Sequence, residues 1–388
     1  MEQLPAVRGS EPHAPGKDKS WHEPACLRLA PDVAHCLCPG GGRSTPAGFS
    51  VSQPPIGDLT LQPVLPALSF PVGLSLAPDG RVFFNERLTG AIRIINPQWQ
   101  LVNTPFCQLT VETSGEQGLF GLTLDPNFAT NQFVYIYYTA GSPLRNRVVR
   151  YTESSGSCTQ AAVIQDDIPA SSNHNGGILQ FGPDGKLYVI TADASNSANS
   201  QNLTSLAGKI LRLNPDGSAP SDNPFFSNAN ANAQKVFSLG HRNSYGFTFH
   251  PHTGHLWETE NGPGDNDEIN RVVAGGNFGW PTVGGIANNQ NFLNPILAYT
   301  PTIAPTGIIA IPEDSTVYPA PYKSNLLFTA WNDGRIRRVF LSGADLTQLG
   351  STSTAYNGGQ GGLVSMMLGA DGYVYVSNAG GIYRVVFQ

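Results

Sequence analysis

From about Leu61 to its C-terminus, the chain repeats one pattern of apolar and polar positions. A short apolar segment ends in Pro or Asp, a tight turn follows, and a second segment of aromatic and β-branched residues comes next, as in GLSLAPDGRVFF (73–84). Asp-Gly between two alternating apolar segments is a strong signal for a β-hairpin. The copies lie at 73–84, 121–138, 177–190, 246–258, 307–330 and 368–377, and the first, third and last are the clearest.

The spacing of the copies, roughly 50–70 residues, suits a four-stranded unit with its loops. Such units cannot bury their apolar faces alone, and stacking them around a channel leaves only short, protected edges. The strands are not separated by amphipathic helices, which disfavours a parallel βαβ fold, and the repeats of a β-solenoid, the alternative, are shorter. We therefore predict an all-β, six-bladed propeller of four-stranded antiparallel blades over 56–388. The terminal segment at 381–387 is expected to pair with the first blade.

Residues 1–55 differ from the rest of the chain. They show no sustained periodicity and are rich in Pro, Gly and charge, so we predict a disordered or non-native N-terminal extension. A secretory signal would need a basic start and an apolar run of about 7–15 residues, and neither is present. Export is therefore not supported by this segment itself.

Composition agrees with many short strands joined by tight turns. The 43 glycines and 31 prolines make up about a fifth of the chain, whereas charged residues are only 13%. The net charge of −6 and the lack of a Lys/Arg run argue against a nucleic-acid partner. Apolar stretches are strand-sized, so we expect no membrane span.

The five cysteines bear on the compartment in which the protein works. Cys107 and Cys158 fall in adjacent repeat units, and a disulfide between them would imply an oxidising environment; the alternative is two unrelated thiols. Cys26, Cys36 and Cys38 form no paired CxxC arrangement, and the last two are weak support for zinc.

Function should reside in loops that depart from the repeat, because a propeller fold carries no function by itself. His174 precedes the inner strand of the third unit, where it can act as a general base or simply cap a strand. Arg242 and Asn243 take the same position in the fourth unit; the guanidinium would bind a carboxylate or oxyanion, or join two blades. Glu116 and Gln117 precede the second unit's inner strand and can reach a polar ligand or be ordinary loop residues.

The segment ENGPGDNDEINRVVAGGNFGWP (260–281) is a Gly-rich loop with an acidic cluster. Asp265, Asp267 and Glu268 offer hard oxygen ligands beside free backbone carbonyls, a set that suits Ca²⁺. The spacing is not that of an EF-hand loop, and a solvated acidic loop is the alternative. We favour calcium.

Several blocks together resemble the soluble quinoprotein glucose/sorbosone dehydrogenase family, which includes the aldose sugar dehydrogenases. The resemblance implies a six-bladed propeller that binds pyrroloquinoline quinone (PQQ) and Ca²⁺ and oxidises aldoses at the anomeric carbon to lactones. It also implies a small sugar substrate, an external electron acceptor, a periplasmic or secreted location, and a monomer or homodimer. The blocks, within about 65–388, are QGLFGLTLDPNF, HNGGILQFGPDGKLYV, LAGKILRLNPDG with DNPF, GHRNSYGF and GPGDNDEINRVVAGGNFGWP.

The resemblance assigns catalytic roles to His174 and Arg242 and a cofactor-binding role to Asn243. His174 matches the family's catalytic base, which takes the proton from the C1 hydroxyl while hydride passes from C1 to the quinone. Arg242 and Asn243 match a pair that contacts the cofactor near its reacting carbonyl.

It also implies two calcium sites. The carbonyl oxygens of Gly262 and Pro263 match the ligands of a cofactor-bound calcium that polarises the quinone carbonyl as a Lewis acid. Glu268, with the carbonyl of Phe278, matches a second, structural calcium site.

Five positions depart from the family pattern. Glu116 stands where Gln is common, Asn173 where an acidic residue is usual, and Asn332 where a cofactor-binding Lys is expected in the sixth-blade region. Gly362 and Val364 stand in place of an Arg pair. We still count Glu116, Asn173 and Asn332 among the cofactor-binding positions.

The departures weaken the cationic surroundings of the cofactor. PQQ carries three carboxylates, and the loss of cationic partners costs about 1.5–3 kcal/mol for each charged hydrogen bond. Arg335 or Arg337, which strand alternation puts on one face, are candidate substitutes. The leading hypothesis is a PQQ-dependent aldose dehydrogenase. The alternatives are a non-catalytic, calcium-stabilised propeller that binds carbohydrate or protein and, ranked lowest, a lactonase-type hydrolase.

Overall fold

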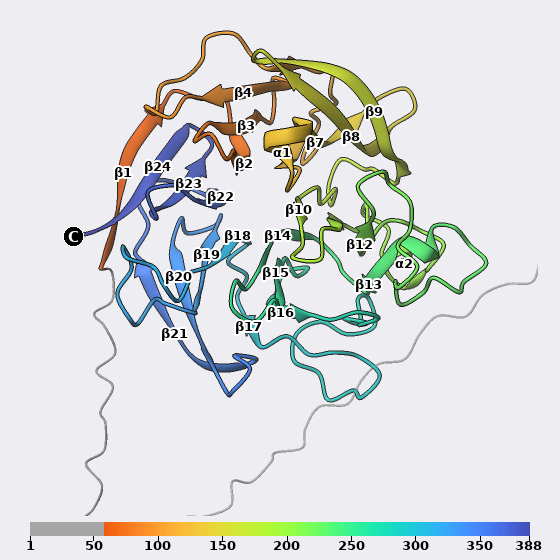
Figure 1. The fold of residues 1–388 in the computed structure, drawn as a ribbon. Coiled ribbons are helices and arrows are strands. Elements are labelled where there is room, and N and C mark those ends of the chain that lie inside the picture. Colours follow the sequence, from red (N-terminus) through yellow and green to blue (C-terminus); the bar gives the residue numbers. More distant parts are fainter. Residues whose placement is uncertain (1–57) are drawn as a thin grey trace, which may run out of the picture. The chain divides into compact units, whose positions relative to one another are not determined.

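The computed structural model describes residues 58–388, which form six four-stranded antiparallel sheets whose inner strands line a central channel. Figure 1 shows the six sheets arranged in a ring. The predicted six-bladed propeller is therefore confirmed. The predicted extension at 1–55 and Cys26, Cys36 and Cys38 lie outside the described residues. No helix within 58–388 is long and apolar enough to cross a membrane.

Each of the first five blades runs outward from its innermost strand in chain order. The first three blades consist of β2 (Pro71–Leu76), β3 (Val82–Glu86), β4 (Ala91–Ile95) and β5 (Cys107–Gln108); β6 (Leu119–Leu124), β7 (Phe133–Ala140), β8 (Arg145–Ser154) and β9 (Ser157–Ile168); and β10 (Leu179–Phe181), β11 (Leu187–Thr191), β12 (Lys209–Leu213) and β13 (Val236–Leu239). The short helical segments lie in the connections: α1 (Phe128–Asn131), α2 (Ala198–Gln201) and a 3₁₀ turn (Ala233–Lys235).

The other three blades repeat this order, except that the last takes its outer strand from the start of the described chain. They consist of β14 (Ser244–Phe249), β15 (Leu256–Glu260), β16 (Asp267–Val272) and β17 (Leu297–Tyr299); β18 (Pro305–Ala310), β19 (Leu326–Ala330), β20 (Ile336–Ser342) and β21 (Gln348–Tyr356); and β22 (Leu363–Leu368), β23 (Val374–Asn378), β24 (Gly381–Phe387) and β1 (Leu59–Pro66).

The ring is closed by β1, which pairs antiparallel with β24 from Leu59 opposite Phe387 to Pro66 opposite Gly381. Figure 1 shows the orange β1 beside the blue β24. The expectation that the terminal segment joins the first blade was wrong in this detail. The N-terminal strand completes the last blade instead, so that the two ends of the propeller are held by one antiparallel ladder.

The apolar core lies between the blades. Within 58–388, the buried apolar side chains form six clusters, and each cluster joins two neighbouring blades. The second strands β3, β11, β15, β19 and β23 are buried along their whole length, because a neighbouring blade covers each face. Each wedge of core therefore forms only when two units pack together, as the repeat predicts.

A disulfide joins the first two blades. Cys107 in β5 bonds Cys158 in β9, with the two Cα atoms 5.5 Å apart. The pairing considered from the sequence is thus formed.

Candidate ligand site at the channel mouth

The hairpin geometry of the blades gathers two sets of loops at one end of the channel. In an antiparallel hairpin the inner strand begins where the second strand ends. Loops before inner strands carry Glu116, His174 and Arg242, and loops after second strands carry Arg87 and Trp331. All five line one cavity of about 430 Å³. The three loops that precede inner strands, which the repeat puts at equivalent positions in their units, thus meet at one cavity.

His174 is held by a carboxylate that the sequence did not reveal. Its Nδ1 lies 2.8 Å from Oδ1 of Asp193, in the loop after β11. The same carboxylate accepts hydrogen bonds from the backbone N of Ser195 (2.8 Å) and from Nε1 of Trp280 (2.9 Å). Since an ionised carboxylate only accepts, Nδ1 carries the proton and Nε2 is the basic nitrogen. His174 also has a φ of 58°, which residues other than Gly rarely adopt.

Glu116 connects the loops of three blades. Its Oε2 accepts a hydrogen bond from the backbone N of His174 (2.7 Å) and lies 3.4 Å from Nδ2 of Asn243. Oδ1 of Asn243 is buried without a partner among residues 58–388. A buried amide oxygen without a donor is costly, so the site calls for a ligand or water with a hydrogen to donate.

Arg242 is oriented by backbone carbonyls. Its Nη1 donates to the carbonyl oxygens of Asn261 (2.8 Å) and Gly262 (2.9 Å), and its guanidinium carbon lies 5.3 Å from the centre of the Trp280 ring. Nε is buried and has no partner within the described part of the chain. Arg242 is therefore a fixed cation with a free donor beside the cavity.

A buried ionic cluster stands behind Arg242. Nδ1 of His241 lies 2.8 Å from Oε1 of Glu258 and 3.1 Å from Oε2 of Glu260. The other oxygen of Glu260 accepts a hydrogen bond from the backbone N of Arg242 (2.6 Å). Burial alone would lower the pKa of His241, but the two carboxylates outweigh it and raise the pKa to about 10. The charged imidazole thus offsets part of the negative charge of Glu258 and Glu260, and Glu260 in turn supports the Arg242 backbone.

The residues predicted for two calcium sites line a single small cavity of about 10 Å³, which is room for about one water-sized sphere. Gly262, Pro263, Glu268 and Phe278 all contribute to it. Glu268 accepts hydrogen bonds from the backbone N of Gly285 (2.6 Å) and from Nδ2 of Asn270 (3.0 Å). Burial and the nearby Glu260 carboxylate raise its pKa to about 8. A cation here would relieve that repulsion.

Asn173 and Asn332 are both exposed, and neither lines the cavity. Asn332 follows β19 in the fifth blade rather than the sixth, and its Nδ2 donates to the carbonyl of Thr302 (3.2 Å). Their contact with a cofactor stays a prediction.

The two arginines considered as substitutes for the missing cations are directed elsewhere. Arg337 forms an ion pair with Asp333, and Nη1 of Arg335 lies 3.8 Å from the same carboxylate. Neither lines the cavity at the channel mouth.

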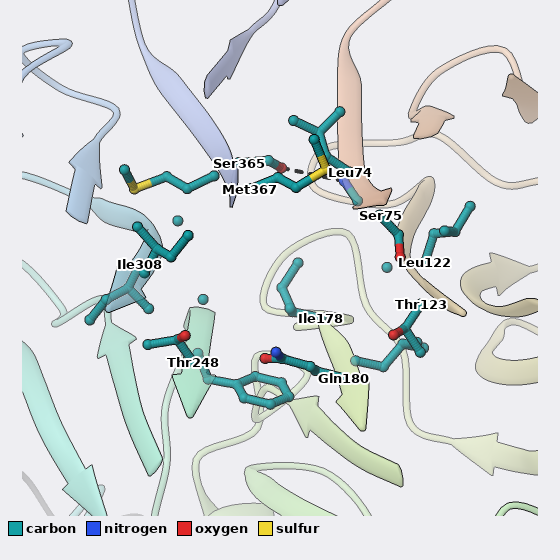
Figure 2. A pocket seen from close by; sticks show the side chains of 18 of the residues that line it. Leu74, Ser75, Leu122, Thr123, Ile178, Gln180, Thr248, Ile308, Ser365 and Met367 are labelled. Carbon is teal, nitrogen blue, oxygen red and sulfur yellow. Dashed lines mark hydrogen bonds between the residues drawn. The ribbon is translucent and has the colours of Figure 1, made fainter. Parts of the chain in front are cut away.

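The channel continues inward as a second cavity of about 320 Å³, which Figure 2 shows from close by. The inner strands of all six blades line it with apolar and uncharged polar side chains, among them Ser75, Thr123, Gln180, Thr248 and Met367. Within 58–388, no Asp, Glu or His lines this cavity. A lactonase-type metal site would need several carboxylates here, so the low rank of that alternative stands.

Fold and site together define a six-bladed propeller with a ligand pocket at one end of its channel, lined by apolar residues and a few charged and polar ones, beside a small cavity lined by Arg242, Glu260 and Glu268. Residues 68–384 match the Glucose / Sorbosone dehydrogenase family, and the chain belongs to that family.

Individual relatives agree with this assignment. Quinoprotein glucose dehydrogenase B of Acinetobacter calcoaceticus is 33% identical over 260 residues, which cover 59% of this chain and 54% of that protein. The chain thus matches about half the length of this curated relative.

Solved structures extend the likeness over most of the fold. An oxidoreductase of Thermus thermophilus, described as a glucose dehydrogenase, is 34% identical with a TM-score of 0.77, covering 84% of this chain and 100% of its own. The PQQ-bound form of aldose sugar dehydrogenase from Streptomyces coelicolor is 27% identical with a TM-score of 0.74, covering 87% of this chain and 100% of its own.

Proposed function

We propose that this protein is a PQQ- and calcium-dependent dehydrogenase that oxidises aldose sugars at the anomeric carbon to lactones. The observation that carries the proposal is the gathering of a carboxylate-held histidine, an arginine and an amide on one cavity of about 430 Å³. This volume lies within the range of small-molecule sites, about 300–1,000 Å³. The unpartnered Nε of Arg242 can donate to a ligand rich in carbonyl and carboxylate oxygens. The unpartnered Oδ1 of Asn243 can accept a hydrogen bond from a water bound with that ligand.

The residues of this chain supply the base and its orientation. Nε2 of His174 takes the proton of the C1 hydroxyl, and Asp193 stabilises the imidazolium that results. Arg242 and Asn243 would hold the cofactor, as would Glu116 through a bound proton or water. PQQ, when bound, supplies the acceptor for the C1 hydride.

A cofactor-bound calcium would be held by the carbonyl oxygens of Gly262 and Pro263, and a second, structural calcium by Glu268 with the carbonyl of Phe278. The position of all four residues beside one small cavity supports cation binding in this loop, as does the elevated pKa of Glu268. Hard oxygen donors of this kind are the ligands that Ca²⁺ prefers. Near the cofactor it would act as a Lewis acid.

A periplasmic or secreted location is part of the proposal, since disulfides persist in oxidising compartments and Cys107 bonds Cys158. The substrate would be a small sugar and the final electron acceptor an external molecule. Whether the protein acts as a monomer or homodimer can be measured by light scattering.

The test is a titration of the purified protein with PQQ in the presence of Ca²⁺, followed by dye reduction with a panel of aldoses. We expect saturable PQQ binding and turnover that His174→Gln abolishes. The matched control is His252→Gln, because the side chain of His252 is 62% exposed and lies outside the cavity. Absence of both PQQ binding and turnover would overturn the proposal.

A second candidate function is a non-catalytic, calcium-stabilised propeller that binds carbohydrate or protein. It is favoured by the loss of cationic residues at Asn332, Gly362 and Val364. It predicts a melting temperature that rises with Ca²⁺ and does not respond to PQQ. A PQQ-induced rise in melting temperature would exclude it.

A further inference from the structure

One cation at the channel mouth lies outside the roles assigned above. Arg87 follows β3 in the first blade and lines the same cavity as His174 and Arg242. Its guanidinium carbon lies 5.0 Å from the centre of the Phe70 ring and 5.6 Å from that of Phe120. The two aromatic faces therefore hold the charged group at the cavity wall.

Arg87 has donors to spare. A guanidinium carries five N–H groups, and within residues 58–388 its one hydrogen bond is from Nη2 to the carbonyl oxygen of Gly115. No carboxylate of the described residues forms an ion pair with it; the nearby Glu116 is directed to His174 and Asn243. Burial lowers the pKa of Arg87, which marks a cation partly withdrawn from water. An anion bound beside it would offset that cost.

The position of Arg87 adjoins the part of the cavity from which the family's cations are missing. Val364 and Ser365 of the sixth blade line the cavity next to the first blade, and Ser365 Oγ accepts the backbone N of Gly73 (3.3 Å). At Gly362, an added Cβ atom would overlap the ring of Trp331. The Trp331 ring therefore occupies space that a longer side chain at 362 would need.

Trp331 extends this wall to Arg87. Its ring stacks on Phe70 with centroids 5.7 Å apart and planes 19° from parallel. Trp331, Phe70 and Arg87 thus form a continuous surface from the fifth blade to the first, with two aromatic rings and one guanidinium. Trp331 remains 41% exposed, so the flat ring of a ligand can pack against its indole at little cost in desolvation.

We propose that Arg87 binds a carboxylate of PQQ and replaces, from the first blade, the cations absent at Asn332, Gly362 and Val364. Phe70 and Trp331 form the apolar wall beside it. The inference rests on the proposed function, and it explains how a cavity without the usual Lys and Arg pair retains affinity for a tricarboxylate.

The experiment compares two ligands with three proteins. Full-length wild type, Arg87→Gln and Arg335→Gln are titrated with PQQ and with its trimethyl ester, in saturating Ca²⁺, by calorimetry. Arg335 is the matched control, since it lies in the same β19–β20 loop as Trp331 and does not line the cavity. We expect Arg87→Gln to weaken PQQ binding about 10- to 100-fold, to leave ester binding unchanged, and to be partly rescued by Arg87→Lys. Arg335→Gln should behave as wild type.

Several outcomes would overturn the inference. If Arg87→Gln binds PQQ as tightly as wild type, Arg87 is not an anchor, although the proposed function survives. If acid and ester lose affinity equally, the role of Arg87 is structural; thermal unfolding of the variants checks this. The KM of Arg87→Gln for glucuronate, a sugar with a carboxylate, is compared with its KM for glucose by dye reduction. If only the KM for glucuronate rises and the PQQ affinity does not change, the carboxylate that Arg87 binds belongs to the substrate. If wild type binds no PQQ, both proposals fail together.

Discussion

The substitution Asp193→Asn removes the negative charge beside His174 and nearly preserves the shape of the side chain at position 193. In the native structure the carboxylate accepts three hydrogen bonds, from His174 Nδ1, Ser195 N and Trp280 Nε1. An asparagine has one oxygen and one NH₂ group, so it cannot accept all three. Two orientations of the new amide are open, and each leaves a defect.

If the amide oxygen stays on the side of His174, its NH₂ group faces the indole N–H of Trp280. That donor then lacks an acceptor, which costs about 1–3 kcal/mol of stability. If the amide flips, NH₂ faces His174, Nδ1 must accept, and the proton moves to Nε2. The nitrogen assigned as the base is then blocked. In either orientation the imidazolium loses its counter-charge, so we expect kcat to fall about 10²–10⁴-fold.

The assay is the initial rate of dye reduction with saturating PQQ, Ca²⁺ and aldose, beside the PQQ dissociation constant and the melting temperature. PQQ affinity should change little, because Asp193 does not line the cavity. Asp216→Asn, at an exposed turn, is the charge-matched control. A kcat for Asp193→Asn within about threefold of wild type, at unchanged PQQ affinity, would refute the assignment of His174 and Asp193 as a base and its positioning residue.

Three further predictions concern stability, each followed by thermal unfolding. In calcium-free buffer, stability should fall as pH rises from about 4.5 to about 8, because folded Glu268 keeps its proton up to about 8 whereas the unfolded chain releases it near 4.5. Ca²⁺ or Glu268→Gln should remove this dependence, and a calcium-independent pH profile would contradict the site. Replacing Cys107 and Cys158 by Ser should lower the free energy of unfolding by about 4 kcal/mol, because the unfolded chain regains the entropy of a loop whose ends are 51 residues apart. An unchanged melting temperature would argue against a stabilising disulfide. Lys209→Met should cost at least about 3 kcal/mol, because the buried Nζ of Lys209, whose pKa burial lowers to about 7, donates to three backbone carbonyls that would lose their partner; a loss below about 1 kcal/mol would show that water takes the place of Nζ.

The strands and turns were predictable because the signals that specify them are local. The segment 73–84 became β2 and β3, and 177–190 became β10 and β11, each around an Asp-Gly turn. The same reasoning located Glu116, His174 and Arg242, since each precedes an inner strand and the inner strands all start on one face.

Other residues of the site carry no local signal. Asp193 and Trp280 are 87 positions apart, and their hydrogen bond exists only because the third and fourth blades pack side by side. Arg87 and Trp331 follow second strands, where the sequence resembles many ordinary turns. Asn332 is the opposite case: the family pattern places it at the cofactor, whereas in the structure it lies outside the cavity, beside Trp331, which lines it, so its contact with a cofactor stays a prediction.

Local patterns along the chain were enough to predict the repeat, the number of blades and the loops that carry the site, because hairpins and alternating apolar faces are specified by neighbouring residues. The closure of the ring and the side chains that meet at the site became known from the folded molecule alone. Closure by β1 on β24, the ionic support behind Arg242, and the position of Arg87 in the wall all depend on packing between blades. Those contacts join residues that are distant in the chain, and no short pattern encodes them.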